Sequence, residues 1–557
     1  MTTFKSMTRR RFLRLAGLGA VAAVAAACQP NPMMSGPTVP TSQPLTPVGR
    51  TRQPTPIPSP SPASAKRSVD VEIALRAVEG EANIFPDLIT RVWRFEAEVL
   101  SGPSETVQPL PDTYLGPILR LRKGQRVRIH FTNDIPDETI VHWHGMHVPA
   151  EMDGHPRFVI GRGETYTYEF DVLNRAGTYW YHPHPHGRTG PQVYMGMAGL
   201  LLVTDDEEEA LRLPSGEFDI PLVLQDRVVD PRGQFVYLPN GPMDRMMGFL
   251  GDTILVNGRP NYTLNVATRP YRLRILNGSN SRIYKLGWSD NTPLTVIGTD
   301  GGLLERPLRK PYVVLGPGER VELWVDFGRY TVGTRLTLQS LPFIAPGGAM
   351  GGMMGGGMMG GGMGNRGTTP FPLPQGAPFP VLTVHVTRES RDKMALPERL
   401  ATLESLPFGD AVNASTPRRF TLSMTPMVGW TLNGRTFGMT DVAEDEVVRL
   451  NTVEVWEFIN SGGGMGMGMG ALPHPMHVHG EPFQVLRREV DPAFRAAWES
   501  VKDGYIDVGW KDTVLVMPGE RVQILRRFAD YPGLFLYHCH NLEHEDMGMM
   551  RNYEIRA

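Results

Sequence analysis

Short segments in which apolar and polar residues alternate recur along this chain of 557 residues, and glycine or proline separates them. Clear examples are residues 126–131, 165–170, 453–458 and 521–525. A period of two, with β-branched and aromatic residues, is typical of antiparallel strands that bury one face. Amphipathic helical patterns are few, and only residues 389–405 and 491–502 offer short ones. The pattern predicts an all-β fold made of sandwiches.

Part of this pattern occurs more than once. Residues 163–170 and 177–184, each beginning with glycine, are matched by residues 519–525 and 533–540. Residues 318–325 repeat the first half only, with no histidine pair behind it. Repetition of this kind predicts copies of one structural unit. We therefore expect three related sandwiches, of which the first and third carry chemistry and the middle one is a spacer.

Turn signals and composition place these sandwiches at residues 68–206, 214–388 and 395–557. The two cysteines of the chain exclude a disulfide framework. A formal net charge of −2 gives no basic face, so we expect no nucleic-acid partner. Beyond the N-terminus, no apolar run is long enough to cross a bilayer. These exclusions leave a globular protein, expected to be a monomer.

The N-terminus has the features of an export signal. Residues 1–27 contain consecutive arginines, Arg9-Arg10-Arg11, followed by an apolar stretch, and they resemble a twin-arginine signal peptide. Two outcomes fit this segment: cleavage after Ala27, or lipidation of Cys28 as a membrane tether. Residues 28–67 are rich in proline and predict a disordered tether. We expect the protein to act in the periplasm or elsewhere outside the cytoplasm.

Histidine spacing provides the strongest chemical signal. Eight of the 15 histidines form four His-x-His pairs. The pairs are His142/His144, His182/His184, His477/His479 and His538/His540. Residues i and i+2 of a strand point to the same face, so each pair presents two imidazoles side by side. Four such pairs, two in each histidine-bearing repeat, predict a cluster of metal ions.

Cys539 lies between the two histidines of the fourth pair. By the same alternation its sulfur points away from both imidazoles and serves a separate site. His474, His544 and Met549 are spaced to complete that site. One thiolate, two imidazoles and a weak thioether form the blue-copper ligand set, whereas zinc would offer no redox role.

These motifs identify a family resemblance. Residues 141–145, 180–184, 474–480 and 538–549 resemble the copper-binding segments of the multicopper oxidases, especially bacterial laccases and copper-efflux (cuprous) oxidases. The resemblance implies three consecutive cupredoxin-type Greek-key domains that hold four copper ions. The implied type 1 ligands are His474, Cys539, His544 and Met549. The implied type 2 ligands are His142 and His477. The implied type 3 ligands are His144, His182, His184, His479, His538 and His540.

The resemblance also implies a reaction. An exported, laccase-like enzyme would take single electrons from phenols, aromatic amines or Cu(I) and reduce dioxygen to water. It implies that Asp153 and Glu545 relay the protons which this reaction consumes. His147, His155 and His186 fall outside the ligand positions. A non-catalytic cupredoxin-type electron carrier is the alternative from another class, and it would need only the type 1 ligands.

Methionine bears on the choice of substrate. Residues 347–364 hold six methionines among glycines, and residues 464–470 form a second such tract. Thioethers are soft ligands that suit Cu(I), which favours a dedicated cuprous oxidase. A flexible loop over the substrate approach is the other interpretation. Copper-efflux oxidases carry a methionine-rich insert in their third domain, but here the chain continues directly from Met427 to Trp430.

Overall fold

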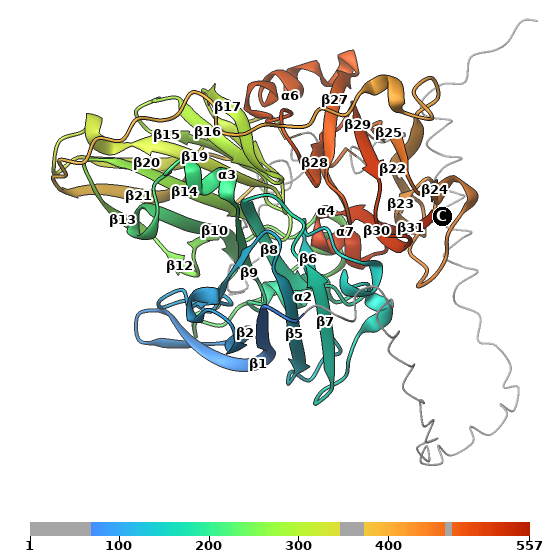
Figure 1. The fold of residues 1–557 in the computed structure, drawn as a ribbon, viewed down its shortest axis with the longest axis horizontal. Coiled ribbons are helices and arrows are strands. Elements are labelled where there is room, and N and C mark those ends of the chain that lie inside the picture. Colours follow the sequence, from blue (N-terminus) through green and yellow to red (C-terminus); the bar gives the residue numbers. More distant parts are fainter. Residues whose placement is uncertain (1–67, 346–372, 463–470) are drawn as a thin grey trace, which may run out of the picture. The chain divides into compact units, whose positions relative to one another are not determined.

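The computed structural model describes residues 68–345, 373–462 and 471–557. The signal and tether at residues 1–67, with Cys28, lie outside this range, as do the two methionine tracts at residues 347–364 and 464–470. Strands dominate the described residues and form six sheets (Figure 1). Among these residues no helix has the length and apolar character needed to cross a bilayer. The all-β prediction is confirmed.

The first two sheets use strands from the N-terminal part of the described chain. One has the order β2 (Leu88–Ser101), β1 (Val71–Phe85), β5 (Arg126–Asn133), β7 (Thr165–Asp171). The other has the order β3 (Val107–Gln108), β4 (Ile118–Arg122), β9 (Gly199–Thr204), β8 (Gly177–Pro183), β6 (Val141–His144). Alternate residues such as Ile129 and Leu201 meet in one core between the two sheets, which makes this a sandwich.

The next two sheets form the middle sandwich, green to yellow in Figure 1. The larger sheet has the order β12 (Arg259–Pro260), β11 (Thr253–Val256), β10 (Asp219–Arg227), β14 (Pro270–Asn277), β19 (Arg320–Asp326), β16 (Leu294–Thr299), β17 (Gly302–Lys310). The smaller has the order β13 (Thr263–Ala267), β21 (Phe379–Arg388), β20 (Arg335–Ser340), β15 (Tyr284–Trp288), β18 (Val313–Leu315). Leu273 and Leu338 belong to the core that they share.

The C-terminal strands form the third sandwich. One sheet has the order β23 (Gly429–Leu432), β22 (Arg418–Thr425), β25 (Thr452–Asn460), β29 (Glu520–Phe528), β27 (Phe483–Val490). The other has the order β24 (Val447–Arg449), β31 (Met550–Arg556), β30 (Gly533–Cys539), β26 (His474–Val478), β28 (Thr513–Val516). Its core includes Trp456 and Tyr537, and Cys539 lies in the same cluster of buried side chains.

Pairing within the sheets corrects two sequence expectations. Each sheet contains one parallel pair, such as β1 with β5 and β22 with β25, so the sandwiches are mixed and not purely antiparallel. Parallel neighbours arise because the chain crosses between sheets before it returns. Residues 389–405 form no helix, because they run along the middle sandwich, where Leu400 packs beside Leu303.

The α-helices of the described residues are short. They are α2 (Thr189–Tyr194), α3 (Asp206–Ala210), α4 (Pro242–Met247), α6 (Arg495–Glu499) and α7 (Leu542–Asp546). Two of them continue strands that carry histidine pairs, since α2 follows β8 and α7 follows β30. Asp546 joins these two helices, because its carboxylate accepts hydrogen bonds from the N–H groups of Thr189 and Gly190, both at 2.9 Å.

Candidate metal centre

The four histidine pairs lie at the ends of β6 and β8 in the first sandwich and of β26 and β30 in the third. All eight side chains are buried, with at most 1% of their surface exposed. Register explains the convergence, because His142 lies opposite His182 and His477 lies opposite His538. Within each sandwich, adjacent strands therefore bring two pairs onto one face.

Histidines of the two sandwiches interleave. The ring of His142 stacks on that of His479 with 3.8 Å between centres, and His144 stacks on His477 at 3.7 Å. Between sandwiches, the Nε2 atoms of His142 and His477 are 3.3 Å apart. The Nε2 atoms of His184 and His538 are also 3.3 Å apart. The structure therefore joins the predicted pairs in one cluster.

The donor set fits a group of metal ions. The Nδ1 atoms of His142, His182 and His477 lie within 2.9 Å of backbone carbonyl oxygens, so these atoms donate and Nε2 remains a lone-pair donor. The Nε2 atoms of His182 and His540 are buried without a hydrogen-bond partner. Several trios, including His184, His479 and His538, bring their ligand atoms within 4.8 Å of one another.

Protonation supports the same conclusion. Burial lowers the pKa of His182 to about 3 and that of His184 to about 4, because a charged imidazolium loses its hydration. The pKa values of His142, His144, His477, His479 and His540 are also well below the usual range for this reason. Neutral imidazoles are the form that binds metal.

A second group lies on the other face of β30. The Sγ atom of Cys539 is 3.4 Å from Nδ1 of His474 and 3.8 Å from Nδ1 of His544. Burial raises the pKa of the Cys539 thiol, so a cation is needed to hold it as thiolate. Met549 is fully buried, and its carbonyl accepts a hydrogen bond of 3.0 Å from the Cys539 N–H. The structure therefore brings together three of the residues predicted to form a blue-copper site, His474, Cys539 and His544, with Met549 adjacent.

The middle sandwich also contributes to this second group, which the sequence did not indicate. The Met246 carbonyl, at the end of α4, lies 3.1 Å from Nε2 of His544 and accepts a 2.8 Å hydrogen bond from Trp430 Nε1. The Trp430 ring lies 4.5 Å from that of His544. His544 is thereby oriented, so that Nδ1 faces the sulfur. Nothing in the sequence marks Met246 or Trp430, since their role depends on packing between sandwiches.

The two predicted proton-relay acids both contact the histidine cluster. Asp153 Oδ2 lies 2.6 Å from Nδ1 of His479, and Asp153 Oδ1 has no hydrogen-bond partner. Burial raises the pKa of Asp153 well above its usual range. Glu545 lies 3.2 Å from Nδ1 of His538 and 3.7 Å from Nε2 of His184. Burial acts to raise the pKa of Glu545, but its contact with the His538 ring outweighs burial and holds the pKa low.

The histidines outside the predicted set contact other partners. His147 Nε2 lies 2.8 Å from Asp530, and His155 Nε2 lies 2.8 Å from Asn552 Oδ1. The His186 ring packs against Phe437 with 4.7 Å between centres.

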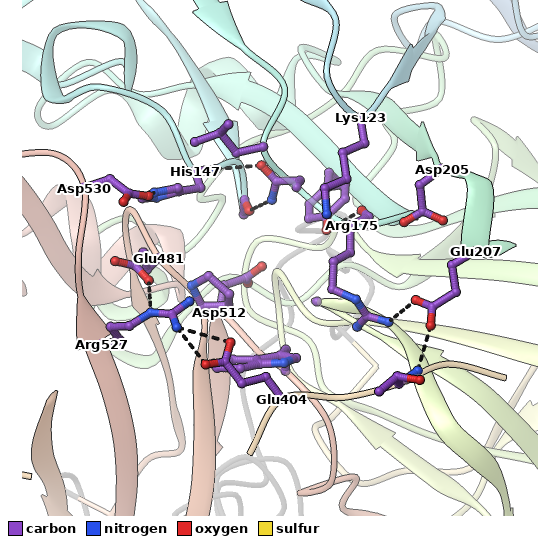
Figure 2. Close-up of a pocket in the computed structure, with 18 of the residues that line it drawn as sticks. Lys123, His147, Arg175, Asp205, Glu207, Glu404, Glu481, Asp512, Arg527 and Asp530 are labelled. Atoms are coloured by element: carbon purple, nitrogen blue, oxygen red, sulfur yellow. Dashed lines mark hydrogen bonds and ion pairs between the residues drawn. The ribbon is translucent and has the colours of Figure 1, made fainter. Parts of the chain in front are cut away.

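A cleft of about 730 Å³ lies beside the cluster. Charged side chains from the first and third sandwiches and from the segment around Glu207 line it, and several form ion pairs such as Arg175–Glu207 and Arg527–Glu404 (Figure 2). Asp512 is part of its wall and lies 3.0 Å from Nε2 of His144. Asp512 therefore lies between the cleft and the cluster, in contact with both. Asp512 could not be singled out from the sequence, because it belongs to no histidine motif.

Comparisons with known proteins agree with this geometry. Two multicopper oxidase family models match residues 92–208 and 411–557. The chain is 30% identical to a multicopper oxidase of Staphylococcus haemolyticus, across 79% of this chain and 82% of that protein. It is 31% identical to a laccase of Bacillus stratosphericus, across 79% and 89%. Its structure resembles that of the McoA multicopper oxidase of Aquifex aeolicus, with a TM-score of 0.69, 34% identity, and coverage of 88% and 100%.

The substitution Cys539→Ser tests whether the two metal groups are separate. Since the sulfur faces away from the histidine pairs, the variant should bind one copper fewer per chain, lose the visible thiolate–copper absorption and keep the cluster. Metal analysis and absorption spectra measure both effects. Ala150→Ser places a hydroxyl in the same buried core and should change neither. Loss of all copper in the cysteine variant would contradict the separation.

Proposed function

The chain belongs to the multicopper oxidase family, and we propose that it couples one-electron oxidation of small reducing substrates to four-electron reduction of dioxygen to water. The observation that carries this proposal is the arrangement around Cys539. Its sulfur faces His474 and His544, whereas His538 and His540 on either side of it face the eight-histidine cluster. One strand thus connects a site of electron entry with a site that suits dioxygen.

Four copper ions fit this proposal. His474, Cys539 and His544, with the thioether of Met549 as a weak ligand, would hold the type 1 ion. His142 and His477 would hold the type 2 ion. The type 3 pair would be held by His144, His182, His184, His479, His538 and His540. Bound copper would provide one-electron redox chemistry and a place for dioxygen to bind.

The protein contributes a short path and a dry site. Two peptide linkages join Cys539 to His538 and His540, so electrons need cross only a few bonds. Trp180, whose ring lies 4.3 Å from that of His182, helps to exclude water from the cluster. In a dry site, an electron that arrives without a proton leaves an unbalanced charge, which is costly at low dielectric. Protons must therefore follow the electrons into the cluster.

Asp153 and Glu545 are placed to move those protons. Each carboxylate touches a cluster histidine, as described above, and each is buried. Asp153, with its raised pKa, can hold a proton beside His479, whereas Glu545 can accept one beside His538. We propose that these two acids deliver the four protons that water formation consumes.

The cluster separates this proposal from a non-catalytic electron carrier. A carrier needs only the group around Cys539, and it would have no use for eight buried imidazoles gathered in one cluster. Burying such groups without a ligand costs stability. Their presence in one cluster therefore favours an oxidase.

Substrate choice lies between phenols or aromatic amines and Cu(I). Similarity to a protein named laccase supports the former. A turn at residues 425–428 favours the latter: Val428 N–H bonds to the Thr425 carbonyl at 3.1 Å, and Met427 has a φ of 63°. This left-handed conformation disfavours a methionine. Met427 is also fully exposed, so it does not contribute to the core.

That turn leads directly into β23, which carries Trp430 beside His544. Met424 and Met547 pack nearby at the edge of the third core. An exposed thioether in a strained conformation, close to the type 1 group, fits capture of a soft cuprous ion. We propose Cu(I) as a substrate alongside phenols. The methionine tract at residues 347–364 would act in the same way, although it lies outside the described residues.

We also propose that residues 1–27 direct export by the twin-arginine route and that the protein acts outside the cytoplasm. A folded, copper-loaded oxidase suits a route that carries folded proteins. Mass determination of the protein purified from membrane and soluble fractions would distinguish a lipid on Cys28 from cleavage after Ala27.

Oxygen uptake tests the proposed reaction directly. Copper-loaded protein supplied with a reducing phenol should consume one dioxygen for every four electrons and release no hydrogen peroxide. An oxygen electrode and a peroxide assay measure both. The copper-free protein is the control. Copper-loaded protein that oxidises no donor, or that produces only peroxide, would rule out the reaction.

The substitutions Asp153→Asn and Glu545→Gln test proton delivery. Each keeps the shape of the side chain but removes the exchangeable acid, so dioxygen turnover should fall about 100-fold or more. Copper content and the type 1 absorption should be unchanged. Asp530→Asn, which alters an acid against His147 in the cleft, should have little effect. Full turnover in both cluster variants would exclude these acids as proton donors.

Met427→Gly tests the cuprous site. Glycine accepts a positive φ, so the variant should be at least as stable as the parent, while Cu(I) oxidation falls and phenol oxidation does not. Thermal unfolding and the two kcat/KM values measure this. Val428→Ala removes a neighbouring exposed apolar side chain and is the matched control. Deletion of residues 348–364 should act in the same direction. Unchanged Cu(I) turnover both in Met427→Gly and in the deletion variant would show that these thioethers do not capture the ion.

A further inference from the structure

Arg320 lies at the start of β19 in the middle sandwich and is fully buried. The middle sandwich has no histidine pair of its own. All five side-chain N–H groups of Arg320 are used. Nε donates to the Thr178 carbonyl at 2.9 Å, and the two Nη atoms donate to the carbonyls of Gly318 and Asp300 at 3.0 and 2.9 Å. The remaining two bonds go to the Asp512 carboxylate, at 2.7 and 2.5 Å. The guanidinium is therefore held in one orientation.

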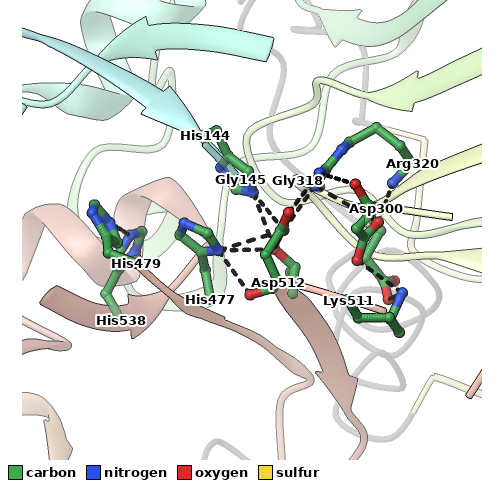
Figure 3. A network of polar contacts seen from close by, with 12 residues as sticks. His144, Gly145, Asp300, Gly318, Arg320, His477, His479, Lys511, Asp512 and His538 are labelled. Carbon is green, nitrogen blue, oxygen red and sulfur yellow. Dashed lines mark hydrogen bonds and ion pairs between the residues drawn. The ribbon is translucent and has the colours of Figure 1, made fainter. Parts of the chain in front are cut away.

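Asp512 is the partner that connects Arg320 to the cluster (Figure 3). Its Oδ1 lies 3.0 Å from Nε2 of His144, and its backbone carbonyl lies 2.8 Å from Nδ1 of His477. These are the two histidines that stack on one another from opposite sandwiches. Asp512 thus orients one histidine with its carboxylate and another with its backbone.

The contact with Asp512 gives His144 the opposite arrangement of ring nitrogens from the neighbouring histidines. A carboxylate whose oxygens already face Arg320 can only accept, so Nε2 of His144 must carry the proton. Its Nδ1 atom has no hydrogen-bond partner and is left to face the cluster. His142, His182 and His477 do the opposite, since their Nδ1 atoms contact oxygen. Ring orientation at His144 therefore depends on Asp512 and on the Thr513 hydroxyl, which lies 3.2 Å from the same nitrogen and itself donates to Asp512 Oδ1 at 2.9 Å.

The turn before Arg320 also packs against the cluster. Gly318 has a φ of 84°, and a Cβ atom there would lie 3.1 Å from both the His144 and His540 rings. A second ion-pair layer supports the arginine from behind: Lys511 contacts Asp300 at 2.9 Å and Glu319 at 3.1 Å. Asp300 Oδ1 in turn accepts the Arg320 backbone N–H at 2.8 Å.

We propose that Arg320 is a positioning residue for the copper cluster: by fixing the Asp512 carboxylate, it selects the Nδ1-facing orientation of His144. This inference rests on the proposed function, because it assigns His144 as a copper ligand. It gives the middle sandwich a chemical role in a site whose ligands all come from the other two. Hydrogen-bond partners that orient metal ligands are commonly worth 10- to 100-fold in metal affinity or activity.

The experiment compares Arg320→Met and Arg320→Lys with the parent protein. Methionine fills the space but cannot hold Asp512, whereas lysine keeps the charge and loses the two-pronged geometry. Copper affinity is measured by competition with a chelator, and the type 1, type 2 and type 3 ions are followed by absorption and electron paramagnetic resonance. Thermal unfolding of the copper-free variants reports on the fold.

Arg272→Met is the matched control. Arg272 is also a buried arginine of the middle sandwich, and it pairs with Glu322 and with Glu208 of α3, away from the histidines. We expect Arg320→Met to weaken copper binding at the cluster about 10- to 100-fold and to alter the type 2 and type 3 spectra. The type 1 absorption should stay, and lysine should restore part of the loss. Arg272→Met should lower stability without changing any copper spectrum.

Two results would overturn the inference. One is an Arg320→Met protein with parental cluster affinity and spectra. The other is an equal loss of cluster copper in Arg272→Met, which would reduce the effect to general destabilisation. Failure of the proposed function would look different, because the parent protein itself would then lack the type 1 and cluster signals.

Discussion

Eight buried imidazoles face one another inside this protein, and most of the structure is arranged to hold them there. Across the boundary between the first and third sandwiches, the Nε2 atoms of two histidine pairs approach to 3.3 Å, and within the third sandwich those of His479 and His538 approach to 3.1 Å. Lone pairs at that distance repel unless a cation or a proton lies between them, and burial makes the protonated form costly. Metal ions remove both difficulties. Without metal, the cluster thus destabilises the folded protein. With metal bound, it stabilises the association of the two sandwiches.

Strand alternation explains why two different sites can lie so close together. Cys539 belongs to the third core, whereas His538 and His540 point to the cluster. No loop could fix this relation as firmly, because β30 is paired on both sides, with β26 and β31. The period of two that made the histidine pairs recognisable is the same property that separates the thiol from them.

For this reason the sequence alone was sufficient to predict the all-β fold and to single out the residues that the two groups contain. Residues whose roles depend on contacts between sandwiches could not be found in this way. Arg320 is the clearest case. The internal repeat aligns it with Thr165 and Arg521, and both of those are exposed. The same position is buried only in the middle copy, because only there does the side chain contact Asp512. Such a contact between sandwiches leaves no pattern in the sequence.

The middle sandwich shows how a repeat can lose its ligands and keep a role. Its strand β20 occupies the place that β8 and β30 have in the other sandwiches, yet it carries Leu338 and Ser340 in line with the histidines of β8. The interpretation of this sandwich as a spacer was therefore incomplete. It reaches the cluster through Arg320 and reaches the cysteine site through the Met246 carbonyl. The middle sandwich thus helps to orient one histidine in each group. A change in its packing would therefore alter the geometry of both sites.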